Sequence, residues 1–267
     1  MLERKFVQQP ELKKQYIDFM TEYETLEHCK EVREVNDSSN LRKWYLPYHA
    51  VLRPSNITTK CRVVFDASAK TDGWSLNDVL NIGSLNQNSL LSIVLCFRIH
   101  RYVLCADIAK MYRQVLVDEH HTPMQRVFWK SDSSHPIRVL ELTTVTYGTA
   151  SAPFLATRAL LQIAIDERQE FPMASKIVED YFYVDNALFG FNEIAEALEA
   201  QKQLNQLLKS GGFHLHKWSS NDHRLLQTVP EADREELVCI EGSDFNEVIK
   251  TLGLLWDPSA DELLFVS

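Results

Sequence analysis

Two aspartates stand at positions where a carboxylate is costly unless it is paired, hydrogen-bonded or bound to a metal. Asp107 ends an otherwise apolar run over 101–107, and Asp185 lies at the tip of an apolar hairpin pattern. If the two strands are neighbours in one sheet, the carboxylates converge and repel each other. Mg²⁺ relieves that repulsion, because it prefers oxygen ligands together with substrate phosphates, and two such ions would activate an attacking hydroxyl and stabilise a leaving phosphate. Taken alone, each aspartate is also typical of an ordinary turn or strand end.

The strands and helices that must position these aspartates follow from hydrophobic periodicity. Buried strands are predicted at 101–107, 125–129 and 137–142, and the last two flank a polar loop. A helix is predicted to begin near Ser151, because Pro153 suits a first helical turn. The residues expected to line one face of that helix are Phe154, Leu161 and Ile165.

The second half of the chain continues this alternation. Two β-rich runs at 177–184 and 187–189 flank Asp185 and Asn186, two residues that tolerate positive φ, and this pattern predicts a tight hairpin. The remaining predicted elements are a helix over 193–209, ended by Gly211 and Gly212, and a strand over 252–256. Elements in this order predict an α+β protein with a split βαβ (ferredoxin-like) sheet and helices on one face.

The N-terminal part is expected to be helical. Residues 1–40 carry apolar side chains at spacings of three and four, the pattern of an amphipathic arm or a pair of helices. A loop-like composition follows at 36–40, and two β-rich runs are predicted at 45–52 and 62–65 around a turn at 54–56.

The composition is that of a globular protein of 267 residues, with 45% hydrophobic and 24% charged residues, which excludes a disordered or fibrous chain. The net charge of −9 argues against a protein that coats nucleic acid with its whole surface, but it allows a local basic channel. The 5 cysteines form no Cys-x-x-Cys pair and are predicted to be buried thiols in a reducing compartment. Without a signal segment or a membrane-spanning run, the chain is expected to be intracellular, in the cytoplasm or the nucleus, with no membrane partner.

Several short segments, taken in order, match the pattern of a known family. They are YLPYHAV (45–51), TTKCRVVFDAS (58–68), SLNDVL (75–80), ADIAKMY (106–112), YGTASAP (147–153), YVDN (183–186), GGFHLHKW (211–218) and LGLLW (252–256). Together they resemble the reverse transcriptase domain of BEL/Pao-class LTR retrotransposons, over about residues 6 to 260. One such motif is weak evidence, whereas the full set in the family's order is specific.

The resemblance implies a right-hand polymerase, with a helical arm at 1–40, fingers at about 41–100 and a palm at about 101–267 that contains the split βαβ sheet. The hairpin near 252–256 would grip the primer. The implied activity is RNA-directed DNA polymerisation, in which Mg²⁺, or Mn²⁺ in its place, assists transfer from deoxynucleoside triphosphates to a primer on an RNA or DNA template. RNase H and integrase segments are absent, so the chain is expected to be a fragment of a longer polyprotein.

The same resemblance implies the catalytic roles. Asp107 and Asp185 correspond to the two catalytic carboxylates, each a Mg²⁺ ligand, with the carbonyl of Ile108 and the side chain of Asn186 as further ligands. Lys217 falls where related polymerases hold a lysine near the triphosphate, and it is a candidate proton donor to pyrophosphate. A lysine at a strand edge is the plain alternative.

The resemblance also implies substrate-binding residues. Arg62 would grip the incoming triphosphate, because a guanidinium binds phosphate oxygens bidentately. Tyr112 lies where the family carries an aromatic gate against a 2′-hydroxyl, and Tyr147 and Gly148 would border nucleotide and template. Without the resemblance, Arg62 would be a solvated strand charge and Tyr112 a core residue. The basic residues expected to face phosphate are Arg53, Lys60, Arg62 and Lys70.

The hairpin departs from the family at Asn186, where a second aspartate is usual. An amide brings no charge, so a large rate loss is expected in a reaction whose catalysis is mostly electrostatic. Three hypotheses stay open: a polymerase of reduced activity, an inactive remnant that only binds nucleic acid, and a relic without function.

Two histidine pairs have weaker claims to chemistry. His214 and His216 alternate along a predicted strand and could bind a metal, but no further ligand lies at the spacing of a site. His120 and His121 are expected to form a solvated turn.

Overall fold

The computed structural model describes residues 2–32, 42–52, 61–236 and 248–264. The chain forms two compact units, each made from two stretches of sequence. Unit 1 combines Met1–Ser84 with Tyr112–Leu155, and unit 2 combines Leu85–Met111 with Ala156–Ser267. The predicted loop at 36–40, the predicted turn at 54–56, Arg53 and Lys60 lie outside the described residues. The expected arm, fingers and palm boundaries stay predictions.

Unit 1 is built from two small antiparallel sheets and an N-terminal helix pair. The first sheet has the strand order β1-β6-β5, and β2 pairs with β3 in the second. The predicted strands of this region and the helices at the start of the chain are confirmed, and Pro10 opens α2 where its missing N–H costs nothing. The expected helical arm over 1–40 is wrong at Cys29–Glu31, which form strand β1 because they pair with β6. The bounds are α1 Leu2–Gln8, α2 Pro10–Thr25, β1 Cys29–Glu31, β2 Tyr48–Leu52, β3 Cys61–Phe65, α3 Leu76–Val79, η1 Met111–Gln114 at the boundary of the units, η2 Thr122–Gln125, β5 Arg126–Trp129 and β6 Arg138–Leu142.

One apolar core joins α2 to both sheets of unit 1. Leu12, Tyr16, Met20 and Tyr23 recur along α2 at spacings of three and four, and all four are buried. They pack with Phe65 of β3 and with apolar residues of β5 and β6. Each large side chain buried in this way contributes about 1.5–3 kcal/mol, so the helix is held by its packing.

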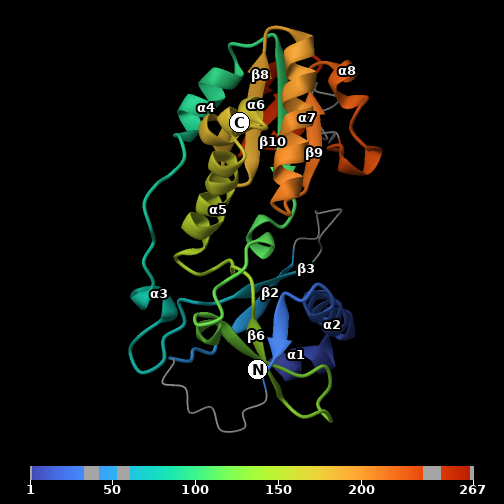
Figure 1. Ribbon diagram of the computed structural model, residues 1–267. Helices are drawn as coiled ribbons and strands as arrows, with labels where there is room; N and C mark the ends of the chain where they lie inside the picture. The colour runs from blue at the N-terminus through green and yellow to red at the C-terminus, as the bar shows by residue number, and fades with distance from the viewer. Residues whose placement is uncertain (1, 33–41, 53–60, 237–247, 265–267) are drawn as a thin grey trace. The chain divides into compact units, whose positions relative to one another are not determined.

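Unit 2 contains a four-stranded antiparallel sheet in the order β7-β8-β4-β9. After β4 the chain passes through unit 1 and returns by two helices to β7, and a helix connects β8 to β9; apart from the insertion, this is the connectivity of a split βαβ sheet (Figure 1). The bounds are α4 Leu90–Phe97, β4 Tyr102–Ile108, α5 Ala152–Asp166 (whose first residues belong to unit 1), α6 Pro172–Asp180, β7 Phe182–Tyr183, β8 Asn186–Phe191, α7 Ile194–Ser210, β9 Leu215–Ser220, α8 His223–Leu226 and η3 Glu231–Asp233.

The two faces of this sheet have different coverings. Figure 1 shows α5, α6 and α7 together in front of the sheet, as expected for a split βαβ arrangement. Helix α4 packs instead with Val103 and Cys105 of β4, Leu188 of β8 and the C-terminal strands. Val103, Cys105 and Asp107 lie on the same face of β4. Val103 and Cys105 are covered on this face, and Asp107 lies toward the end of the strand.

The predicted strand over 177–184 is wrong for most of its length. Pro172 opens α6, which continues to Asp180, and only Phe182–Tyr183 is strand. Ala174, Ile177 and Val178 recur at helical spacing and are buried, so packing selects a helix although isoleucine and valine favour strands.

The predicted apolar face of α5 is also wrong. Its buried apolar residues in unit 2 are Ala156, Leu160 and Ala164, whereas Ile165 is exposed. Small alanines allow a helix to approach its neighbours closely, and this makes them core residues although they bury little area.

The predicted strand over 252–256 is a turn followed by a strand. Leu252 and Gly253 have φ angles of 49° and 81°, as in the type I′ turn that joins two strands of a hairpin. The strands of this second sheet of unit 2 are β10 Ile249–Thr251, β11 Leu254–Asp257 and β12 Glu262–Leu264.

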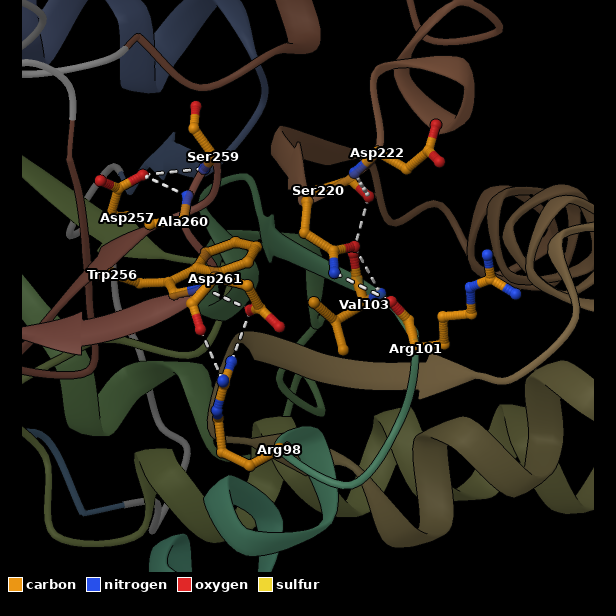
Figure 2. Close-up of polar contacts among 11 residues, drawn as sticks. Arg98, Arg101, Val103, Ser220, Asp222, Trp256, Asp257, Ser259, Ala260 and Asp261 are labelled. Atoms are coloured by element: carbon orange, nitrogen blue, oxygen red, sulfur yellow. Dashed lines mark hydrogen bonds and ion pairs between the residues drawn. The ribbon is translucent and has the colours of Figure 1, made fainter.

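Figure 2 shows how this C-terminal sheet is fastened to α4. The guanidinium of Arg98 donates to the carboxylate and to the carbonyl of Asp261, both at 2.5 Å. The indole Nε1 of Trp256 donates to the same carboxylate at 3.0 Å, and its ring is fully buried against Phe97. The guanidinium of Arg98 and the buried ring of Trp256 thus both hold the C-terminal sheet against α4 at Asp261.

Two predicted buried thiols are confirmed, since Cys29 and Cys105 are buried and free, while Cys96 is half-buried. Burial raises the pKa of Cys29 and of Cys105 to about 12, which makes both poor nucleophiles. The side chains of Cys61 and Cys239 lie outside the described residues. Among the helices that the structure describes, none is long and apolar enough to cross a membrane.

Candidate active site

The sheet of unit 2 brings the two predicted aspartates together, Asp107 on β4 and Asp185 in the turn that leads into the neighbouring strand β8. In the pairing of β4 with β8, Asp107 lies opposite Asn186, and the backbone N–H of Ile108 donates to the carbonyl of Asp185 at 2.8 Å. Burial raises the pKa of Asp185, and the negative charge of Asp107 raises it further. The two carboxylates are therefore close enough to repel each other.

The turn that carries Asp185 is strained. Tyr183 pairs with Asn186, so the two loop residues are Val184 and Asp185, and the predicted loop of Asp185 and Asn186 is wrong by one position. Val184 has a φ of 55°, a region that a β-branched residue occupies at a cost of about 1–3 kcal/mol. Such a conformation persists only when its surroundings impose it.

Gln87 provides part of that constraint. Its side-chain oxygen accepts the N–H of Val184 at 2.8 Å, and its amide nitrogen lies 3.4 Å from the carbonyl of the same residue. The sequence gives no sign of this role for Gln87, because its neighbours do not indicate a hydrogen bond to the backbone of Val184, 97 residues further along the chain.

A β-bulge shapes the other side of Asp107. In the pairing of β4 with β9, Cys105 lies opposite Ser219 and Asp107 opposite His216, so β9 has one extra residue between these pairs. Lys217 has a φ of 53° within this extra turn of backbone. In a regular strand, His216 and Lys217 would point to opposite faces.

Because of the bulge, both residues reach the same carboxylate. Nε2 of His216 lies 3.0 Å from Oδ1 of Asp107, and Nζ of Lys217 lies 4.0 Å from Oδ2. The charge of Lys217 also opposes the rise in the pKa of Asp185. The predicted catalytic set of Asp107, Asp185 and Lys217 is thus assembled in one place.

Glu235 is a further carboxyl group beside this cluster. Its backbone N–H donates to the carbonyl of Trp218 at 3.0 Å, which brings the segment after η3 alongside β9. Burial raises the pKa of Glu235, Asp107 adds to the rise, and Lys217 lowers it. Sequence reasoning missed Glu235 because no motif or periodic element contains it.

The oxygen atoms at this site are of the kind that Mg²⁺ binds. Within the described residues, no three His, Cys, Asp or Glu side chains group closely enough to form a metal site of protein ligands alone. Mg²⁺ commonly takes one or two carboxylates and completes its shell with water and substrate phosphates, so Asp107 and Asp185 fit it. Asn186 donates its amide to Oδ1 of Asp185 at 3.0 Å. The ligand roles of Ile108 and Asn186 stay predictions.

In unit 1, Arg62 and Tyr147 are brought together. The guanidinium carbon of exposed Arg62 lies 5.0 Å from the centre of the Tyr147 ring, within the range of a cation–π interaction. The hydroxyl of Tyr147 donates to the carbonyl of Val63 on β3, and burial raises the pKa of Tyr147. The aromatic ring thus supports the guanidinium of Arg62.

Position 148 in unit 1 requires a glycine, because of its backbone conformation and the atoms packed against it. Its φ is 99°, and a Cβ atom added there would lie 2.3 Å from the carbonyl oxygen of Phe65. Asn77 holds the turn: its amide nitrogen donates to the carbonyl of Gly148 at 3.0 Å, and its oxygen accepts the N–H of Ala150 at 2.7 Å. The close backbone approach predicted at Gly148 is therefore an approach to β3.

The other predicted residues are dispersed. Tyr112 is half-buried in η1 and belongs to unit 1, and Lys70 of the same unit is exposed. His214 lies 2.7 Å from Asp233, so His214 and His216 contact different carboxylates. His120 lies beside Asp118 in an exposed turn, as expected.

Comparison with models of known protein families gives no match, and comparison with curated proteins also gives none. Solved structures do match. One is the foamy viral protease–reverse transcriptase in complex with double-stranded DNA, with a TM-score of 0.52 and 16% sequence identity. The alignment covers 72% of this chain and 28% of that chain. At this identity the likeness is one of fold, and the chain has a reverse-transcriptase-like fold.

Proposed function

We propose that the chain is the fingers-and-palm part of an RNA-directed DNA polymerase of the BEL/Pao retrotransposon class. The observation that carries the proposal is the placement of Asp107 on β4 beside Asp185 in the turn that leads into the neighbouring strand β8, with Lys217 against Asp107. The reverse-transcriptase-like fold supports it, and so do the family motifs, which contain each of these residues. On this proposal unit 2 includes the palm.

The chemistry follows from the charges at the site. Mg²⁺ held by Asp107 and Asp185 would supply the positive charge that lowers the pKa of a primer 3′-hydroxyl and neutralises the triphosphate. Lys217, whose Nζ lies 4.0 Å from Oδ2 of Asp107, would hold a proton beside the transferring phosphates and give it to pyrophosphate. Asn186 orients Asp185 through its amide. In unit 1, Arg62 would bind triphosphate oxygens, and Tyr112 would exclude a 2′-hydroxyl.

A second function has its own supporting observation. Asn186 contributes a hydrogen-bond donor to Asp185 where a third carboxylate would contribute charge. Electrostatic stabilisation is the main catalytic effect in phosphoryl transfer, so this loss favours a protein that binds primer and template without extending the primer.

Primer extension on an RNA template separates the two functions. The wild-type chain is measured with Mg²⁺ and, separately, with Mn²⁺, and Asp107→Asn serves as the blank. Extension above the blank that rises in Asn186→Asp supports a polymerase limited by its missing charge. No extension by either protein, with salt-dependent primer–template binding retained, selects the binding function.

A further inference from the structure

A small polar pocket of about 230 Å³ lies in unit 2, at the opposite end of β4 from the candidate active site. Tyr102 begins β4 and Asp107 lies near its end, which corresponds to about 17 Å along an extended strand. The volume is below the roughly 300–1,000 Å³ of drug-sized ligand sites, so the pocket suits a small ion with few attached atoms. The residues that line it are Arg101, Tyr102, Asn221, Asp222 and Arg224.

Two arginines lie against one aromatic ring at this pocket. The guanidinium carbon of Arg101 lies 5.2 Å from the centre of the Tyr102 ring, and that of Arg224 lies 5.8 Å from the same centre. Each distance is within the range of a cation–π interaction. Two positive charges that share one ring repel each other, and an anion bound beside both relieves that repulsion.

One of these two charges is balanced by a carboxylate. Nε and Nη2 of Arg224 donate to the two carboxylate oxygens of Asp222, at 2.9 and 2.5 Å. Arg101 is exposed, and it has no carboxylate partner in the part of the chain that the structure describes. The lining therefore has a surplus of positive charge, on a chain whose net charge is −9, and such a local field attracts an anion.

The backbone that carries Arg101 is fixed by two asparagines. The N–H of Arg101 donates to the side-chain oxygen of Asn192 at 3.2 Å, and its carbonyl accepts the side-chain amide of Asn221 at 2.9 Å. The oxygen of Asn221 accepts the N–H of Val103 at 3.0 Å, so the same side chain also holds the start of β4. Figure 2 shows the guanidinium of Arg101 directed away from Val103. The Arg101 side chain is therefore anchored at its base, with its charged end available to a ligand.

We propose that this pocket binds a phosphate group, as inorganic phosphate or as a phosphomonoester, beside the guanidinium groups of Arg101 and Arg224. A guanidinium binds two phosphate oxygens at once, and the two arginines come from segments on either side of the sheet edge, one before β4 and one after β9. Asp222 holds Arg224 but also opposes an anion, so it limits the affinity. The proposal does not rest on the polymerase assignment, because none of these residues belongs to the candidate active site.

Titration of the full chain with inorganic phosphate tests the proposal. Binding is measured from the ³¹P linewidth and by calorimetry, in EDTA and at constant ionic strength. Arg101→Gln should weaken phosphate binding about 10- to 100-fold, the usual effect of losing a hydrogen-bonded charge. Arg168→Gln is the matched control: Arg168 of unit 2 pairs with Glu179 and does not line the pocket, so this variant should bind like the wild type.

Asp222→Asn distinguishes a ligand site from an ion pair that is only structural. Asp222 is the N-cap of α8 and accepts the N–H of Arg224, a role that asparagine also performs, so the variant should fold. Loss of the carboxylate releases the guanidinium of Arg224 and removes a negative charge from the pocket. Phosphate should therefore bind about 3- to 10-fold more tightly to Asp222→Asn than to the wild type. Melting temperatures verify that all variants are folded.

Ribose 5-phosphate and inorganic phosphate distinguish the two sources of the ligand. Tighter binding of the ester, lost in Arg101→Gln, identifies a phosphomonoester, and tighter binding of the free ion identifies inorganic phosphate; both support the proposal. Three results would overturn it: no saturable binding by the wild type, equal binding by Arg101→Gln, or equal affinity for phosphate and acetate. EDTA and the absence of primer and template keep this outcome separate from that of primer extension.

Discussion

In unit 2, Nε2 of His216 lies 3.0 Å from Oδ1 of Asp107, on the opposite carboxylate oxygen from Lys217. The contact exists because the extra residue in β9 turns the consecutive side chains of His216 and Lys217 toward Asp107. A carboxylate that binds a cation depends on such outer hydrogen bonds for its orientation. On the proposed function, His216 would be a positioning residue for Asp107.

His216→Ala should lower primer extension about 10- to 100-fold, mainly by raising the Mg²⁺ concentration needed for half-maximal rate. His216→Gln keeps a side-chain donor and should recover part of the loss. Extension rates are measured over a Mg²⁺ series. His214→Ala is the matched control, because His214 contacts Asp233 and not Asp107. Equal losses in both alanine variants would contradict the positioning role.

The positive φ of Val184 predicts that glycine gives a more stable protein than alanine at this position, which is the reverse of the usual order. Alanine normally stabilises a protein over glycine by about 0.4–1 kcal/mol, through the entropy of the unfolded chain. At Val184 an alanine keeps the left-handed strain of about 1–2 kcal/mol, and a glycine removes it. Val184→Gly should thus be more stable than Val184→Ala by up to about 1 kcal/mol.

Urea unfolding of the two variants measures this difference directly, because both lose the two valine methyl groups and they differ from each other only at Cβ. The same pair at Glu196, an exposed position inside α7, should show the usual order, with alanine more stable. If both positions favour alanine, the turn at Val184 does not hold the conformation described here.

The strands could be predicted from the sequence where burial requires a run of apolar residues. The positions of Asp107 and Asp185 could be predicted too, because each interrupts such a run. Asp107 and Asp185 stand out in the sequence because each follows residues suited to a core. The helix α6 was not predictable in this way, since Ile177 and Val178 carry a strand propensity that tertiary packing overrides.

The surroundings of Asp107 depend on pairings between distant segments and leave no local signal. The φ of Lys217 follows from the register of β9 against β4, and lysine has no preference for that conformation. Gln87 acts on Val184 and Glu235 lies beside β9 only after the sheet has formed. A reader of the sequence can therefore locate the carboxylates but cannot list the groups that orient them.

The raised pKa of Asp185 predicts a pH dependence of stability. Between its ordinary value of 3.8 and the higher value in the folded state, the folded chain binds a proton that the unfolded chain has released. Stability from this group is therefore present below 3.8 and is lost as the pH rises through the folded pKa. Asp185→Asn should be more stable than the wild type at neutral pH, and the two should converge below about pH 3.8.

Urea unfolding in EDTA, from about pH 3 to about pH 7, measures this dependence without a bound cation. Asp118 provides a control of opposite sign, because hydrogen bonds from His120 lower its pKa. Asp118→Asn should lose stability relative to the wild type as the pH rises. A difference between Asp185→Asn and the wild type that is constant over this range would show that neither burial nor Asp107 raises the pKa of Asp185.

Gly148 and Gly73 separate backbone strain from a steric clash. Both lie in unit 1 and have positive φ, 99° and 86°, but a Cβ on Gly73 would meet no atom within 4 Å, and one on Gly148 would lie 2.3 Å from the Phe65 carbonyl oxygen. Gly73→Ala should cost about 1–2 kcal/mol through strain alone. Gly148→Ala should cost a further 1–3 kcal/mol, roughly, because the turn or β3 must move.

Hydrogen exchange distinguishes the two mechanisms at one amide. The N–H of Ala150 donates to Asn77, so a displaced turn at Gly148 should expose it to exchange, and Gly73→Ala should leave it protected. Denaturant unfolding gives the free energies of both variants. Equal costs and equal protection would mean that Gly148 is needed for its φ alone, and that the contact between this turn and β3 is looser than 2.3 Å implies.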